Sequence, residues 1–199
     1  DAIPKLLMQK DGDKFVYENI QKDPRLLLKT AQKYVNYIMS LAKCADDVND
    51  EDDIRMYIDK SLSNTFFLGF LFIMFPKTRI IYCQRNFLDN AMSLYFDKND
   101  DPNLCWTSSL SDIIKYYKVH DELSAHWMKL FNNGSNFITV SYDHLVHHPE
   151  ETMKKIVSFC NLEWKEQYLR FHKNKRTFFN QNSFQVRSPI HTKFTNLWK

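Results

Sequence analysis

The fold is decided by the stretch Arg79-Ile-Ile-Tyr-Cys-Gln-Arg-Asn-Phe-Leu-Asp-Asn-Ala-Met-Ser93. Its apolar start is typical of a buried strand, its polar middle of a turn, and its end of a helix. Arg85 stands where the strand ends, and open α/β sheets bind their ligands at that position. Ser93 lies about two turns into the helix. Because a guanidinium and a hydroxyl both donate to anionic oxygens, the pair predicts a site for one phosphate.

Around this segment, strands alternate with helices. Strand-like runs stand at residues 56–59, 79–84 and 137–142; helices are expected at about 24–43, 61–75, 88–96, 110–131, 149–160 and 163–172, with a loop at 97–109. Such alternation predicts an α/β fold, a parallel sheet in three layers with helices on both faces. We expect residues 1–199 to form a single domain.

The composition is that of a globular protein with an uneven distribution of charge. Hydrophobic residues make up 44% of the chain, and only three glycines argue against a Gly-rich all-β fold. The net charge is +3, but residues 165–199 hold eight Lys or Arg against one acidic residue. This basic stretch favours a polyanionic ligand, a nucleotide or a nucleic acid, although a solvated basic surface is the commoner reason for such a stretch.

The sequence gives little information on the compartment. The four cysteines are scattered and lack the spacing of a zinc site. No signal-peptide pattern opens the chain, and the longest apolar run, residues 66–75, is too short to span a bilayer. The compartment is left open, with the cytoplasm slightly favoured.

Five motifs together resemble those of the sulfotransferases that use 3′-phosphoadenosine 5′-phosphosulfate (PAPS). Residues 79–93 resemble the family's 3′-phosphate-binding strand, turn and helix. The other four are Asp59-Lys60 with Asn64 ("DKxPxN"), His126-Trp127 ("HW"), Tyr142-Asp-His-Leu-Val146 ("YEdLvxxP") and Ser183-Phe-Gln-Val-Arg-Ser-Pro-Ile190 ("SxQVrxPi"). The resemblance covers nearly the whole chain and looks closest to the tetratricopeptide-linked bacterial and tyrosylprotein sulfotransferases. It implies a P-loop-NTPase-like sulfotransferase fold.

One family motif is missing. The Ser/Thr/Gly-rich 5′-phosphosulfate loop, such as "PRSGTT", has no counterpart in this chain. Ile3-Pro-Lys-Leu-Leu7 resembles the segment just after that loop and after the glutamate that serves as the family's catalytic base. We therefore expect an N-terminally truncated chain, or one that a separate segment completes.

The resemblance also implies roles for particular residues. Lys60 is similar to the catalytic lysine that neutralises the leaving phosphate, Arg85 and Ser93 to the 3′-phosphate ligands, and Tyr142 to a nucleotide contact. Each has a plainer alternative: an exposed Lys60, a helix N-terminal cap plus a surface salt bridge to Asp89 for Arg85 and Ser93, and a Tyr142 in the core.

The C-terminal loop is expected to complete the nucleotide site. By resemblance, Gln185, Val186 and Arg187 line the nucleotide, with Arg187 on a phosphate. Asn182 stands at the position of the reactive-centre serine of the tyrosylprotein enzymes, so either Asn182 donates a hydrogen bond or Ser183 replaces it.

Further polar residues remain to be placed. The basic residue that precedes the closing Trp in the family is Leu197 here, so Lys193 or Lys199 would supply that charge. His120 and His126 on the long helix are more typical of packing or surface residues than of a general base. The loop-like run 143–148 is rich in histidine, but the family's chemistry needs no metal, and we expect none.

The leading prediction is a PAPS-dependent sulfotransferase, or the major part of one, acting on a hydroxyl or phenol of a small molecule, carbohydrate or peptide. A nucleotide-binding remnant that does not transfer is one alternative. A basic nucleic-acid-binding module is another, with Phe178, Phe179 and Phe184 as stacking platforms. We do not expect nucleic acid as the partner, and the oligomeric state is left open.

Overall fold

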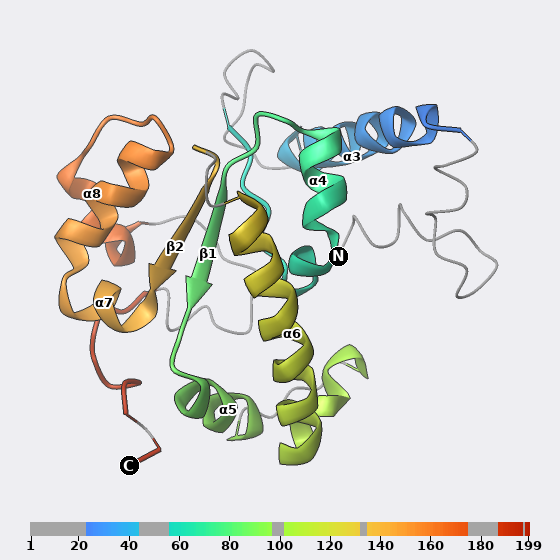
Figure 1. Ribbon diagram of the computed structural model, residues 1–199. Coiled ribbons are helices and arrows are strands. Elements are labelled where there is room, and N and C mark those ends of the chain that lie inside the picture. Colours follow the sequence, from blue (N-terminus) through green and yellow to red (C-terminus); the bar gives the residue numbers. More distant parts are fainter. Residues whose placement is uncertain (1–22, 44–55, 97–101, 132–134, 175–186, 197) are drawn as a thin grey trace. The chain divides into compact units, whose positions relative to one another are not determined.

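The computed structural model describes residues 23–43, 56–96, 102–131, 135–174, 187–196 and 198–199 (Figure 1). The chain divides into two compact units, Asp1–Thr78 and Arg79–Lys199. That both belong to a single domain stays a prediction. The described helices include none whose length and hydrophobicity would let it cross a bilayer.

In the first unit, the described residues form helices packed around Phe67. These helices are α3 (Arg25–Lys43), a 3₁₀ helix η2 (Leu62–Phe67) and α4 (Leu68–Met74). Leu26 and Tyr34 of α3 pack against the buried Phe67. The Ser61 hydroxyl caps η2 by accepting the backbone N–H of Ser63 at 3.4 Å. The single helix expected to end near residue 75 is therefore a 3₁₀ turn continued by an α-helix.

The strand predicted at residues 56–59 is wrong. Residues 56–60 have no regular secondary structure, and their side chains are exposed. A strand needs a neighbour for its backbone N–H and C=O groups, and none of the described residues pairs with this segment.

The second unit is built on two parallel strands. β1 (Ile80–Gln84) and β2 (Phe137–Ser141) pair in register, from Ile80 opposite Phe137 to Gln84 opposite Ser141. The connection between them runs through α5 (Phe87–Phe96), a 3₁₀ helix η3 (Pro102–Ser108) and α6 (Leu110–Phe131). Because the strands are parallel, both end at the same edge of the sheet, as Figure 1 shows.

Helix α6 packs on one face of this sheet. Tyr82 of β1 stacks on His120 with ring centroids 6.2 Å apart, and Phe137 of β2 stacks on Phe131 at 6.1 Å. On the opposite face Val140 is buried, whereas Cys83 is exposed. The predicted three-layer sheet is thus seen only in part, since the described residues contribute two strands with α6 packed on one face.

The described part of the second unit has three further helical segments. They are α7 (Tyr142–His147), α8 (Pro149–Phe159) and a 3₁₀ helix η4 (Glu166–Lys173). Pro149 begins α8, as the sequence predicts. Two predictions of irregular structure are wrong: residues 143–148 lie largely in α7, and residues 102–108 form η3 rather than a loop. In η3 the hydroxyls of Thr107 and Ser108 donate to carbonyls three residues earlier, which stabilises a 3₁₀ turn.

Candidate functional site

The ends of β1 and β2 bring Arg85 and Tyr142 together. Arg85 follows Gln84, Tyr142 follows Ser141, and Gln84 and Ser141 are register partners. The Arg85 Cζ atom lies 4.9 Å from the centroid of the Tyr142 ring, a cation–π contact. Two residues that the sequence places at separate strand ends therefore share one site at the carboxyl edge of the sheet.

The guanidinium of Arg85 is half-buried and only partly hydrogen-bonded. Its Nη2 donates to the backbone carbonyl of Phe194 at 2.6 Å. Its Nε is buried, and the described residues offer it no hydrogen-bond partner. A buried donor without an acceptor costs about 1–3 kcal/mol. An anionic oxygen reaching Nε would remove this cost.

Asp89 is the most buried carboxylate of this region. It lies in the first turn of α5, where Asn86 Oδ1 accepts the backbone N–H groups of Leu88 at 2.9 Å and of Asp89 at 3.3 Å. The Asp89 side chain is only 2% exposed, and its Oδ2 accepts the backbone N–H of Asn196 at 2.8 Å. The alternative of a surface salt bridge is wrong, because Asp89 is not at the surface.

We call Arg85, Asp89, Tyr142, Phe194 and Asn196 the strand-exit cluster. The sequence predicts Arg85 and Tyr142 in it but gives no sign of the other three. Burial raises the pKa of the Tyr142 phenol, and the charge of Arg85 opposes this while Asp143 and Asp89 add to it. The phenol therefore remains protonated at neutral pH and is a hydrogen-bond donor. Ser93 is half-buried on α5, one turn beyond Asp89.

The C-terminal segment approaches the cluster through a closed turn. The Thr192 carbonyl accepts both the N–H and the hydroxyl of Thr195, at 3.0 and 2.8 Å. Lys193 is exposed within this turn, and Arg187 is exposed and donates to the Asn174 carbonyl at 3.3 Å. The remaining predicted residues of the loop lie outside the described residues: Asn182, Ser183, Gln185 and Val186, together with Phe178, Phe179 and Phe184.

Lys60 belongs to the first unit and is exposed. Hydrogen bonds hold the residues on both sides of it. Asp59 Oδ2 accepts the Tyr34 hydroxyl at 2.7 Å, and the Ser61 and Ser63 hydroxyls lie 2.9 Å apart. Burial, and then the Asp59 carboxylate, raise the pKa of Tyr34 well above its usual range. The backbone at Lys60 is thus held without a helix or a strand.

The histidines of α6 occupy packing positions. His120 is half-buried, its ring stacks on Tyr82 and Tyr116, and its Nδ1 lies 3.3 Å from the Ser124 hydroxyl. Burial lowers the pKa of His120, so its neutral form is favoured. His126 is exposed and meets Trp127 edge to face at 4.9 Å.

The histidines that follow β2 are engaged locally. His144 Nδ1 lies 3.0 Å from the Thr152 hydroxyl, and His147 Nδ1 lies 2.7 Å from the Asp143 carbonyl. Within the described ranges, no group of three or more His, Cys, Asp or Glu side chains is arranged to hold a metal ion.

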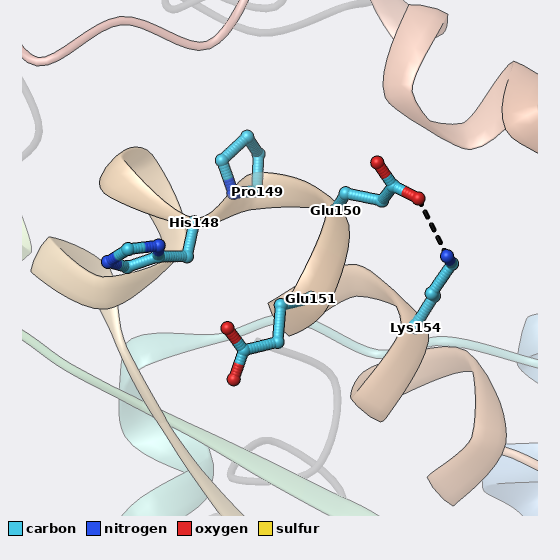
Figure 2. Close-up of a pocket in the computed structure, with 5 residues that line it drawn as sticks. All are labelled: His148, Pro149, Glu150, Glu151 and Lys154. Atoms are coloured by element: carbon cyan, nitrogen blue, oxygen red, sulfur yellow. Dashed lines mark hydrogen bonds and ion pairs between the residues drawn. The ribbon is translucent and has the colours of Figure 1, made fainter.

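A shallow hollow at the start of α8 lies apart from the predicted residues. Figure 2 shows its lining, His148, Pro149, Glu150, Glu151 and Lys154. Lys154 Nζ is paired with Glu150 Oε1 at 2.6 Å, while Glu151 adds a second carboxylate. This charge distribution disfavours an anionic ligand, so the strand-exit cluster is the better candidate for one.

Comparison with known proteins gives two matches. A family model described as "Sulfotransferase family" matches residues 12–166, which include Lys60, Arg85, Ser93 and Tyr142. An uncharacterized protein of Aquifex aeolicus (strain VF5) is 28% identical over 203 residues, a match that covers 100% of this chain and 25% of that protein. The chain therefore spans a quarter of the length of this curated relative.

Proposed function

Because this chain belongs to the sulfotransferase family, we propose that it takes part in sulfuryl transfer with PAPS as the donor and a hydroxyl or phenol as the acceptor. The motif order favours the branch that includes the tetratricopeptide-linked and tyrosylprotein enzymes. The acceptor group belongs to a small molecule, a carbohydrate or a peptide.

The observation that supports PAPS as the sulfuryl donor is the incomplete hydrogen bonding of the Arg85 guanidinium. A cation stands at the carboxyl edge of a parallel sheet, where α/β proteins bind nucleotides, with a buried Nε–H that lacks an acceptor among the described residues. A 3′-phosphate oxygen supplies that acceptor, and its charge strengthens the hydrogen bond. The hydroxyls of Ser93 and Tyr142 are the further donors that we assign to the nucleotide.

The chemistry requires little of the protein beyond positioning and charge. The bond from sulfur to the bridging phosphate oxygen breaks, a bond from sulfur to the acceptor oxygen forms, and the acceptor's proton passes to a base. Negative charge grows on the bridging oxygen, and Lys60 neutralises it. We place the base and the contacts to the 5′-phosphosulfate outside the described residues.

The C-terminal segment contributes the remaining contacts in this proposal. Gln185, Val186 and Arg187 line the nucleotide, and Arg187 and Lys193 add positive charge near its phosphates. Asn182 or Ser183 donates a hydrogen bond near the reacting group. The basic character of residues 165–199, with eight Lys or Arg and one acidic residue, is consistent with a polyanionic donor.

The first test is thermal stabilisation by 3′-phosphoadenosine 5′-phosphate (PAP), with adenosine 5′-phosphate as the ligand that lacks the 3′-phosphate. A ligand at 100 times its Kd stabilises the native state by about 2.7 kcal/mol. Adding PAP should raise the Tm of the wild type, whereas the Tm of Arg85→Ala should be the same with and without PAP. Arg79→Ala is the matched control, because Arg79 immediately precedes β1 as Arg85 follows it, is exposed and donates to the Cys160 carbonyl.

The outcomes separate the alternatives. No shift of the wild type with PAP contradicts the proposal. A shift that Arg85→Ala retains removes Arg85 from the site. Binding of PAP without release of PAP from PAPS in the presence of phenolic, carbohydrate and peptide acceptors favours the nucleotide-binding remnant over a complete enzyme.

A further inference from the structure

Two hydrogen bonds attach the C-terminal segment 192–196 to the segment from Arg85 to Asp89, which leads from β1 into α5. The Phe194 carbonyl accepts Arg85 Nη2 at 2.6 Å, and the Asn196 N–H donates to Asp89 Oδ2 at 2.8 Å. The second bond joins residues 107 positions apart in the sequence. Two attachment points fix both the position and the direction of the turn, which a single bond does not.

From this arrangement we infer that Asp89 is a positioning residue for nucleotide binding: through Asn196 it holds the Phe194 carbonyl against Arg85, and so orients the guanidinium before the ligand arrives. The inference rests on the proposed function, since it assigns Arg85 to the nucleotide phosphate. Asp89 itself is not assigned a contact with the ligand.

Hydrogen bonds within the turn support this role. Thr195 closes it with two hydrogen bonds to the Thr192 carbonyl. Asn196, which follows, adopts a left-handed backbone conformation with φ 59°. Residues other than Gly, Asn and Asp rarely adopt this conformation. In this conformation the Asn196 N–H points at the Asp89 carboxylate, while the Phe194 carbonyl, two residues earlier, accepts from Arg85.

The burial of Asp89 supports a specific role for its charge. A carboxylate that is 2% exposed is costly unless hydrogen bonds and positive potential compensate for it. The Asn196 N–H and the amino end of α5 supply these. The charge of Arg85 lowers the pKa of the Tyr142 phenol and that of Asp89 raises it, so both groups lie within electrostatic range of this phenol. An oriented guanidinium loses less entropy when it binds a phosphate, which raises affinity.

The test measures PAP affinity and exchange of the Asn196 amide hydrogen in the full chain. Loss of a hydrogen bond to a charged, buried acceptor corresponds to about tenfold to a hundredfold in an equilibrium constant. In Asp89→Ala we expect the Asn196 amide to exchange at least about tenfold faster and the Kd for PAP to rise by about tenfold or more. Asp89→Asn keeps a carbonyl acceptor, so its amide exchange rate and its Kd for PAP should lie between those of the wild type and Asp89→Ala.

Two substitutions at Asn196 test the same hydrogen bond at its donor. Asn196→Gly keeps the N–H and fits the left-handed conformation, so both measurements should stay close to wild type. Asn196→Pro removes the N–H and is restricted to a negative φ, so it should weaken PAP binding as Asp89→Ala does. Because Asn196 lies in none of the helices or strands, this variant tests the inference even where Asp89→Ala fails to fold.

The results distinguish the inference from the function on which it rests. Wild-type PAP affinity in Asn196→Pro or in folded Asp89→Ala overturns the positioning role and leaves the proposed function standing. A wild type that does not bind PAP overturns both. Faster amide exchange together with unchanged PAP affinity shows a merely structural attachment and also contradicts the inference.

Discussion

The hydroxyl of Tyr34 on α3 donates a 2.7 Å hydrogen bond to Oδ2 of Asp59, the residue immediately before Lys60. Residues 56–60 are exposed and have no regular secondary structure, so side-chain contacts such as this one determine where their backbone lies. The Tyr34 ring is itself fixed by Phe75, at a centroid separation of 5.7 Å. Helix α3 therefore positions the segment that carries the proposed catalytic lysine.

Replacing Tyr34 with Phe should slow transfer while nucleotide binding is preserved. The variant keeps the packed ring and loses the hydrogen bond to Asp59, which is worth about 1 kcal/mol. If the bond orients Lys60 for the transition state, kcat for sulfuryl transfer falls several-fold while the Kd for PAP is unchanged. Tyr37→Phe is the matched control, because Tyr37 is an exposed tyrosine on the same helix. Equal kcat values for the two variants would contradict the role of Tyr34.

The same hydrogen bond predicts a loss of stability at alkaline pH. Burial and the Asp59 carboxylate raise the pKa of Tyr34 in the folded chain above its unfolded value of 10.0. The unfolded state therefore releases this proton first, and the stabilisation is present in full below about pH 10 and lost as the pH rises above it. Urea unfolding between pH 8 and 11 should show a smaller decline in Tyr34→Phe than in the wild type. Parallel curves for the two proteins would be evidence against this linkage.

Much of the second unit could be predicted because its signals are local. Apolar spacing and β-branched content predict the helix at residues 110–131 and the strands at 79–84 and 137–142. The structure confirms the helix and shows the strands at 80–84 and 137–141. Two strand ends in a parallel sheet then bring Arg85 and Tyr142 to one edge. Helix α7 was missed because Asp143 and the histidines after it resemble a loop, although Ser141 supplies an N-cap acceptor for the His144 N–H.

The parts that could not be predicted depend on contacts between distant residues. Nothing near Asp89 in the sequence indicates that its carboxylate is buried against Asn196, 107 positions later. An acidic residue in the first turn of a helix is ordinarily an exposed group that interacts with the helix dipole. The strand predicted at residues 56–59 is wrong because its local pattern is plausible, but a strand also needs a partner strand, which the local sequence does not show.

Acidification should destabilise the chain through His120. Burial among aromatic rings lowers the pKa of His120 in the folded state below its ordinary 6.5, so the unfolded state binds this proton first. Stability is therefore present above about pH 6.5 and declines as the pH falls below it. His120→Phe keeps a flat aromatic ring between Tyr82 and Tyr116 and should show a shallower decline between pH 7 and 5. His126→Phe, at an exposed position, should retain the wild-type slope; if His120→Phe does as well, His120 is not the titrating group.

Replacing Arg85 with Lys separates the geometry of the guanidinium from its charge. A lysine keeps the positive charge but lacks the planar group that lies over Tyr142 and donates to the Phe194 carbonyl. If a phosphate is bound through the oriented Nε–H, PAP affinity falls by about tenfold or more, close to the loss in Arg85→Ala. Arg79→Lys, immediately before β1, should bind as the wild type does. Near-normal affinity in Arg85→Lys would mean that charge alone attracts the nucleotide, and the strand-exit cluster would then be an electrostatic attraction site rather than a shaped phosphate site.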